Sequence, residues 1–185
     1  MKRTFFAIKV CDEAKVLLKN ILLNFPELRQ KIKIANPDNP HITLKFLADT
    51  KVCDIENIDE KIQTKLENLK RFSFQYESTG VFPNSSRARV FFIRINKGLK
   101  NLQLLHNLIE QNIYVIVYGK DYKDFIPHLT LGRRKSKRIN KIEVMNFLNY
   151  KFKPVINYVD EIIWFESILQ SGGAIHKPIK KYKLK

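Results

Sequence analysis

The sequence predicts an α+β fold in which two halves are fused into one body. Segments with the period-two alternation of strands are interspersed with segments whose apolar residues recur every three or four positions, as in helices. A short phrase of the form Pro-His-apolar-Thr-apolar occurs twice, once in each half, with its histidines at positions 41 and 128. No low-complexity linker separates the halves. We therefore expect a single domain over residues 1–185, built from two pseudo-symmetric lobes around a central cleft.

The expected elements follow a similar order in the two halves. Strands are expected at residues 4–10, 32–35, 41–47, 72–81, 90–95, 127–132 and 155–169, with an edge strand in the tail, 176–185. Helices are expected at residues 12–26, 55–69, 98–113 and 140–149. Each strand that carries the repeated phrase is thus followed by a polar stretch, a helix and further strands.

The composition indicates a basic, globular protein. There are 34 Lys and Arg against 18 Asp and Glu, a formal net charge of +16, and this excess favours a phosphate-rich partner such as nucleic acid. A hydrophobic fraction of 44% excludes a disordered chain. Cys11 and Cys53 have no metal-site or disulfide spacing, and the apolar run near the N-terminus is too short for a signal peptide or a membrane span. We expect a cytoplasmic monomer that does not enter a membrane.

The repeated phrase has the residue types of an acid–base site. Successive side chains of a strand point to opposite faces, so His41 and Thr43 share one face, as do His128 and Thr130. An unperturbed imidazole titrates near pH 6.5, so one histidine can remove a proton while the other delivers one. Hydrolysis of a phosphodiester needs this combination, and the threonine hydroxyls can donate hydrogen bonds to phosphate oxygens.

A metal could hold the same histidines, but the phrase has no adjacent carboxylate and no HxH or HExxH spacing. We therefore do not expect a metal. One copy of the phrase would be typical of an ordinary strand histidine. The second copy, again behind a proline, favours a functional pair.

These motifs resemble those of the two-histidine phosphoesterases, and most closely the RNA 2',3'-cyclic phosphodiesterases, also called 2'-5' RNA ligases or LigT/ThpR-like proteins. The resemblance spans nearly the whole chain and is carried by residues 5–8, 39–47, 82–92, 125–133 and 165–169. Two departures are Ala48, where the family often has glycine, and the lack of the usual tryptophan before Asn36.

The resemblance implies a bilobal fold with two antiparallel sheets facing a basic cleft and helices outside. It implies that His41 and His128 are the catalytic pair and that Thr43 and Thr130 bind the phosphate. A substrate arginine is expected after the second motif. Arg133 matches best, with Arg134 as the other candidate.

The implied reaction opens a 2',3'-cyclic phosphate at an RNA end to a 2'-phosphate, with reversible 2'-5' joining of tRNA halves as a side activity. The resemblance implies that no metal or nucleotide cofactor takes part. Two alternatives stay open. One is a non-catalytic RNA-binding protein, and the other is a phosphodiesterase for small cyclic nucleotides or ADP-ribose cyclic phosphate.

Other residues of interest have mainly structural interpretations. His106 falls on the apolar stripe of its helix and is expected in the core, and His176, after a glycine turn, is expected at the surface. Four aromatic residues flank the motifs and are candidates for stacking on a base: Phe5, Phe46, Tyr122 and Phe125.

Overall fold

The computed structural model describes residues 1–36, 39–114, 124–135, 138–170 and 173–185. The elements run in the order β1 (Lys2–Lys9), α1 (Asp12–Asn24), α2 (Pro26–Lys31), β2 (Ile32–Ile34), β3 (His41–Thr50), α3 (Asp54–Glu67), β4 (Phe72–Phe82), a 3₁₀ turn (Ser85–Arg87), β5 (Val90–Ile95), α4 (Leu99–Ile113), β6 (His128–Arg134), α5 (Lys141–Leu148), β7 (Val155–Val159), β8 (Glu161–Gln170) and β9 (Gly173–Lys183).

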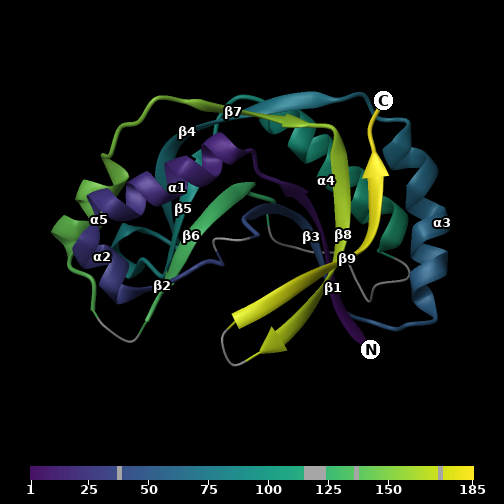
Figure 1. The fold of residues 1–185 in the computed structure, drawn as a ribbon, viewed down its shortest axis with the longest axis horizontal. Coiled ribbons are helices and arrows are strands. Elements are labelled where there is room, and N and C mark those ends of the chain that lie inside the picture. The colour runs from purple at the N-terminus through teal and green to yellow at the C-terminus, as the bar shows by residue number, and fades with distance from the viewer. Residues whose placement is uncertain (37–38, 115–123, 136–137, 171–172) are drawn as a thin grey trace.

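The strands form two antiparallel sheets. Sheet A has the strand order β3-β1-β8-β9, and sheet B has the order β2-β6-β5-β4-β7. Figure 1 shows them as the two arms of an arch, with β3 and β6 on its concave side. The predicted α+β class is confirmed, and each sheet contains one of the two strands that carry the repeated phrase.

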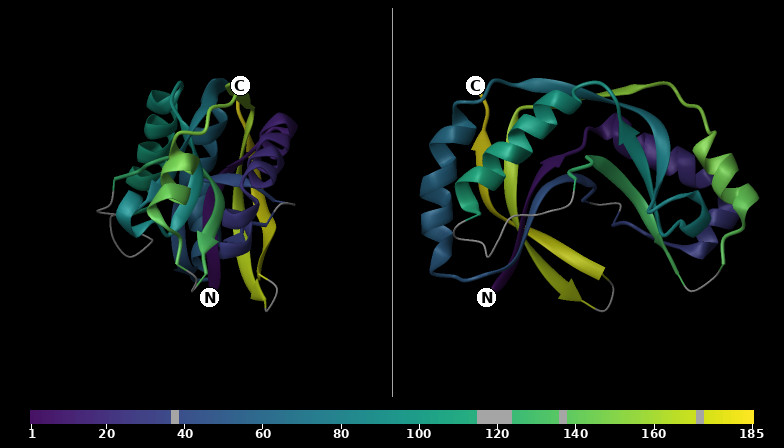
Figure 2. Two further views of the ribbon diagram at one scale, coloured as in Figure 1. Left: turned by 90° about the vertical axis from the view of Figure 1, so that its left-hand side faces the viewer. Right: turned by 180° about the vertical axis from the view of Figure 1, so that it is seen from behind.

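Helices cover the outer side of each sheet. Helices α3 and α4 lie beside sheet A, and α1, α2 and α5 lie beside sheet B (Figures 1 and 2). One continuous apolar core joins both arms, because it includes buried side chains from sheet A such as Phe6 and Ile42 and from sheet B such as Phe91 and Leu129. Burial of this shared core is the main source of stability for the arch.

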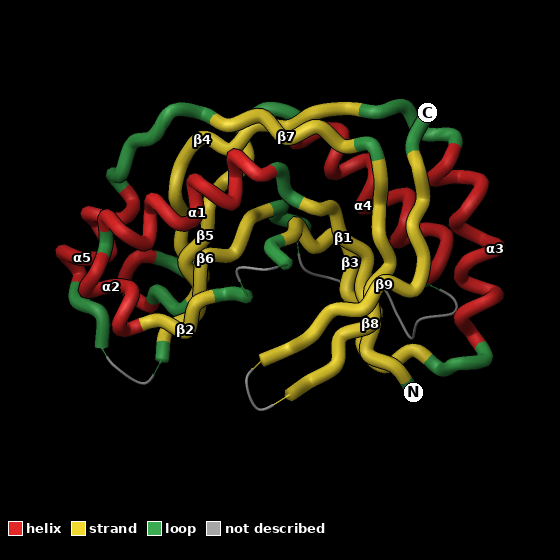
Figure 3. Tube along the Cα trace, in the orientation of Figure 1, coloured by secondary structure: helices red, strands yellow, loops and turns green. Residues whose placement is uncertain are grey.

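Two predicted elements differ from the structure. Residues 155–169, expected as one extended run, are two strands separated by Asp160. Strand β7 pairs with β4 in sheet B, whereas β8 pairs with β1 and β9 in sheet A (Figure 3). Pro26, expected to end a helix, occupies the first turn of α2, where its missing N–H costs nothing. Within the described ranges, no helix is long and apolar enough to cross a bilayer.

Candidate active site

His41 is the first residue of β3 and is held at its Nδ1 atom. Ile42 and Leu44 point into the core, which leaves His41 and Thr43 half-buried on the opposite face. The Nδ1 atom of His41 lies 2.9 Å from the backbone oxygen of Asn39. Since a carbonyl oxygen can only accept, Nδ1 carries the proton, and the lone pair is on Nε2.

His128 repeats this arrangement at the start of β6. Leu129 and Leu131 are buried, while His128 and Thr130 are half-buried on the other face. The Nδ1 atom of His128 lies 2.7 Å from the backbone oxygen of Ile126. Both histidines therefore present Nε2 as the atom that can take up or give back a proton. We call the face that carries the histidine the inner face of each sheet.

The fold brings the two histidines together from different sheets. Strands β3 and β6 approach each other. Burial lowers the pKa of each imidazole, despite the hydrogen bonds from Nδ1 that favour the charged form. Positive charge on Arg133 and on His41 lowers the pKa of His128 further. Mutual repulsion of this kind makes a doubly protonated pair unfavourable.

An aromatic cluster surrounds His41 on the inner face of sheet A. The ring centroid of His41 lies 5.0 Å from that of Phe5 and 6.4 Å from that of Phe165. Phe5 and Phe165 belong to a small apolar cluster separate from the main core. Phe46 stacks on Phe5, is 40% exposed, and lies under the guanidinium of Arg3.

His176, expected at the surface, belongs to this cluster, so that prediction is wrong. It lies opposite Ser167 in the pairing of β8 with β9, and its ring meets the ring of His41 edge to face at a centroid distance of 5.1 Å. Its Nδ1 atom is buried and has no hydrogen-bond partner among the described residues. Burial and the charge on His41 lower the pKa of His176 to about 4, so it is neutral at pH 7.

A bulge in β6 decides which arginine faces the site. Opposite residues of an antiparallel pair share a face. The pairing of β5 with β6 shifts by one residue between Phe92, opposite Thr130, and Phe91, opposite Gly132. Beyond this bulge Arg133 is opposite Val90 and lies on the inner face with His128.

Arg134 lies on the other face. It is opposite Ile32, whose side chain is in the main core, and its own side chain is half-buried. The structure thus places Arg133 on the inner face with His128 and Arg134 on the opposite face.

Arg94 is a further cation on the inner face that sequence reasoning missed. It lies opposite His128 in the β5–β6 pairing, its Nε donates to the backbone oxygen of Thr79, and its guanidinium lies 5.5 Å from the centroid of Phe92. The rings of Phe82 and Phe92 both contact His128, at centroid distances of 5.1 and 5.0 Å. Arg94 can be recognised as a site residue only from the register of the β5–β6 pairing, which cannot be read from the sequence.

The remaining sequence candidates lie away from the inner faces or outside the described residues. His106 is buried, as expected, with its Nδ1 atom 2.8 Å from the backbone oxygen of Leu44 and its ring stacked on Phe125. Tyr122 lies outside the described residues. Within the part of the chain that the structure describes, no group of three or more His, Cys, Asp or Glu side chains is placed to hold a metal ion.

Two antiparallel sheets that each present a His-x-Thr strand on an inner face define the class of two-histidine phosphoesterases. A model of the 2'-5' RNA ligase superfamily matches residues 23–164, and the chain belongs to this family, as its motifs predict.

Named relatives are similar over almost the whole chain. An RNA 2',3'-cyclic phosphodiesterase from Aquifex aeolicus is 30% identical over 97% of this chain and 94% of its own length. One from Archaeoglobus fulgidus is 28% identical over 98% and 99%. The crystal structure of E. coli LigT complexed with 3'-AMP has the same fold, with a TM-score of 0.75 and 20% identity over 100% of this chain and 98% of that one.

Proposed function

We propose that this protein is an RNA 2',3'-cyclic phosphodiesterase that opens a terminal 2',3'-cyclic phosphate to a 2'-phosphate by acid–base catalysis. One observation carries the proposal. Two histidines on facing strands each anchor Nδ1 to a backbone oxygen two residues earlier and keep Nε2 available for proton transfer. The names of the relatives from Aquifex aeolicus and Archaeoglobus fulgidus support the substrate class.

The geometry favours a division of labour between the histidines. Burial lowers the pKa of both histidines, and the charges of Arg133 and His41 lower that of His128 in addition. His128 is therefore the more suitable base, because a base must be neutral before it acts. In this mechanism water attacks phosphorus, and its proton passes to Nε2 of His128. The bond from phosphorus to the 3'-oxygen breaks, and that oxygen receives a proton from Nε2 of His41.

A bound phosphate favours the protonated form of His41 that the acid role requires. Burial disfavours protonation of His41, but an anion between the two motifs favours it, so substrate binding prepares the acid. Thr43 and Thr130 are half-buried beside the histidines and would donate hydrogen bonds to the two non-bridging oxygens as negative charge develops there. Arg133 would neutralise part of that charge.

The cellular setting is part of the proposal. The substrates we favour are tRNA-like fragments that end in a 2',3'-cyclic phosphate, with 2'-5' joining as the reverse reaction. Cys11 and Cys53 are both free thiols, which suits a monomer in the reducing cytoplasm.

The test is hydrolysis of a nucleoside 2',3'-cyclic phosphate and of an RNA oligonucleotide with the same end, with and without a chelator. We expect full activity with chelator and a 2'-phosphate product from both substrates. Activity that returns only on addition of a divalent ion would contradict the two-histidine mechanism. RNA binding without turnover would indicate a non-catalytic RNA-binding protein. Turnover of the nucleotide alone would indicate a small cyclic phosphate as the substrate.

A further inference from the structure

The inner face of sheet B continues past the histidine as a row of positive charges. Lys33 of β2 is directly opposite Arg133 of β6, so these two side chains share the inner face. Lys135, two residues after Arg133, follows directly after the end of β6. We call Lys33, Arg133 and Lys135 the basic lip, because they lie where β6 meets the edge strand β2 (Figure 1).

Gly132 allows β2 to lie close enough to β6 to place Lys33 opposite Arg133. A Cβ atom on Gly132 would lie 2.8 Å from the backbone oxygen of Lys33 and 2.9 Å from the Cδ1 atom of Ile32. Backbone cannot move aside as a flexible side chain can, so only glycine permits this close approach.

The charges of the basic lip are not neutralised by ion pairs with acidic side chains of the described residues. Among the ion pairs between described residues, Lys31 is paired with Glu143, whereas none involves a residue of the basic lip. Lys135 makes only a 3.3 Å hydrogen bond from its Nζ to the backbone oxygen of Gln30. All three cations are exposed and are therefore available to an anion.

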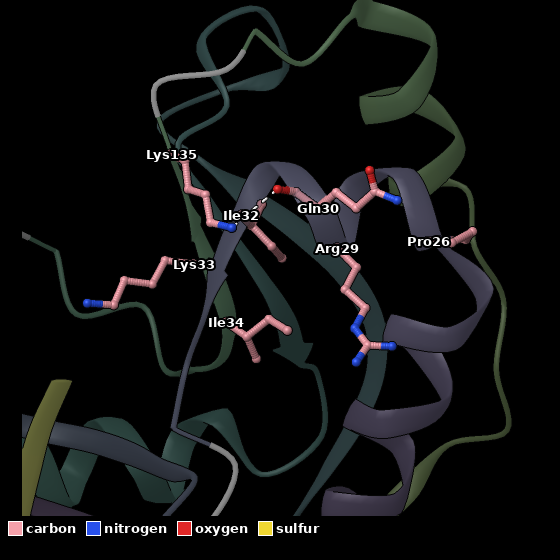
Figure 4. Close-up of a pocket in the computed structure, with 7 residues that line it drawn as sticks. All are labelled: Pro26, Arg29, Gln30, Ile32, Lys33, Ile34 and Lys135. Atoms are coloured by element: carbon pink, nitrogen blue, oxygen red, sulfur yellow. Dashed lines mark hydrogen bonds between the residues drawn. The ribbon is translucent and has the colours of Figure 1, made fainter. Parts of the chain in front are cut away.

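A hollow of about 490 Å³ lies beside the basic lip. Its lining residues are Pro26, Arg29, Gln30, Ile32, Lys33, Ile34 and Lys135, three of them cations and none of them acidic. Figure 4 shows Lys33 pointing away from the hollow on one side of β2 and Arg29 on the other, while the side chain of Lys135 turns toward the backbone oxygen of Gln30 at the rim of the hollow. The positive surface thus extends beyond the residues that can reach a phosphate held between the histidines.

We propose that the basic lip binds the backbone phosphates of the RNA strand that precedes the cyclic end. This inference rests on the proposed function and adds the path of the polymer. Lys33 lies on the edge strand β2 and Lys135 lies past the end of β6, so both are farther from the histidines than Arg133 and are placed to meet the phosphates that precede the cyclic end. Lys33 and Lys135 therefore select an RNA chain over a free nucleotide.

The experiment compares binding of a short RNA oligonucleotide ending in a 2'-phosphate with binding of the corresponding nucleoside 2'-phosphate over a range of salt. We expect wild type to prefer the oligonucleotide. In the double variant Lys33→Gln/Lys135→Gln we expect that preference to fall about tenfold, and the salt slope for the oligonucleotide to decrease by about 1.4, the loss of two single-strand phosphate contacts.

The matched control is Lys61→Gln/Lys65→Gln, which removes the same charge from the exposed side of α3 on the outside of sheet A. It should bind both ligands as wild type does. Equal losses for oligonucleotide and nucleotide in Lys33→Gln/Lys135→Gln, or a change no larger than that of the control, would overturn the proposal. Because binding needs no turnover, a chain that binds the oligonucleotide in the expected way without hydrolysing it would refute the proposed function and leave the basic lip standing.

Discussion

The two histidines have the same backbone setting and different neighbours. Each begins a strand, follows a proline, and anchors Nδ1 to the carbonyl oxygen two residues back. His41 is surrounded by aromatic rings and by the neutral imidazole of His176. Its cross-strand neighbour is Lys9, whose charge is paired with Glu161. His128 has two phenylalanine rings as well, but its neighbours on the inner face include two cations, Arg94 opposite it on β5 and Arg133 further along β6.

This difference indicates how a duplicated motif can support two opposite roles. A nearby cation without an acidic partner disfavours protonation and suits a base. Surroundings in which each charge is paired let the bound phosphate decide the protonation state and suit an acid. The two copies of the motif therefore need no difference in sequence to take different roles. The roles of the two histidines differ because the strands packed beside each copy differ.

Replacing either histidine should have the largest effect. We expect His41→Ala and His128→Ala each to lower kcat by about 10²–10⁴, because each removes one proton-transfer group, while RNA binding is largely retained. Rates with a nucleoside 2',3'-cyclic phosphate and a separate RNA titration measure the two effects. Near-normal turnover in either variant would overturn the catalytic assignment.

The pH dependence of the rate tests which histidine is the base and which is the acid. Burial lowers both pKa values in the free protein, so kcat/KM should reach its maximum at a lower pH than kcat, because bound phosphate raises the pKa values in the complex. His128→Ala should remove the rising limb of the profile and His41→Ala the falling limb. Loss of the opposite limbs would exchange the two roles.

Replacing Arg133 should lower kcat/KM by more than ten times as much as replacing Arg134. We expect Arg133→Gln to lower kcat/KM by about 10- to 100-fold, the value of a charge-assisted hydrogen bond to phosphate, and Arg134→Gln by much less. Arg133 lowers the pKa of His128, so its removal raises that pKa and moves the rising limb of the profile to higher pH. An unchanged limb in Arg133→Gln, or a larger loss in Arg134→Gln, would show that the bulge in β6 does not select the substrate arginine.

The strands of the motif were predictable because alternation and buried partners are local signals. Apolar Ile42 and Leu129 define the face of each strand, and the histidines follow on the other face. Arg133 differs from His128 in parity along the strand, so strict alternation would put it on the wrong face. Only the bulge, a property of strand pairing, puts Arg133 on the inner face.

The position of His176 was even harder to predict from the sequence. Its place depends on how β9 pairs with β8 and how β8 pairs with β1, and the first of these pairings contains its own register shift. No local pattern in residues 173–183 encodes contact with a residue of β3. The split of residues 155–169 between two sheets was hidden for the same reason, since both strands read as one apolar run.

A fixed charge at position 176 should make the surroundings of His41 resemble those of His128. We expect His176→Lys to lower the pKa of His41, because a cation about 5 Å away disfavours a second positive charge, and to lower kcat near neutral pH by about tenfold. The falling limb of the profile should move to lower pH. The matched control is His176→Phe, which keeps a ring against Phe5 and should change kcat by no more than about threefold. Equal effects of both variants would mean that His176 contributes packing and not electrostatics.

The smallest effect is expected at Gly80, on the inner face of sheet B. A Cβ atom there would lie 2.5 Å from the Cε2 atom of Phe92 and 2.7 Å from the Nε atom of Arg94. Phe92 is fully buried and contacts His128, so Gly80→Ala should shift the ring and disturb the histidine. We expect a loss of about 1–3 kcal/mol in the free energy of unfolding, a fall of about 5 °C in Tm, and about a threefold lower kcat. Thermal unfolding and the kinetic assay measure these together. A variant with normal Tm and kcat would show that Phe92 can move without cost, and that the aromatic neighbours of His128 are less rigid than those of His41.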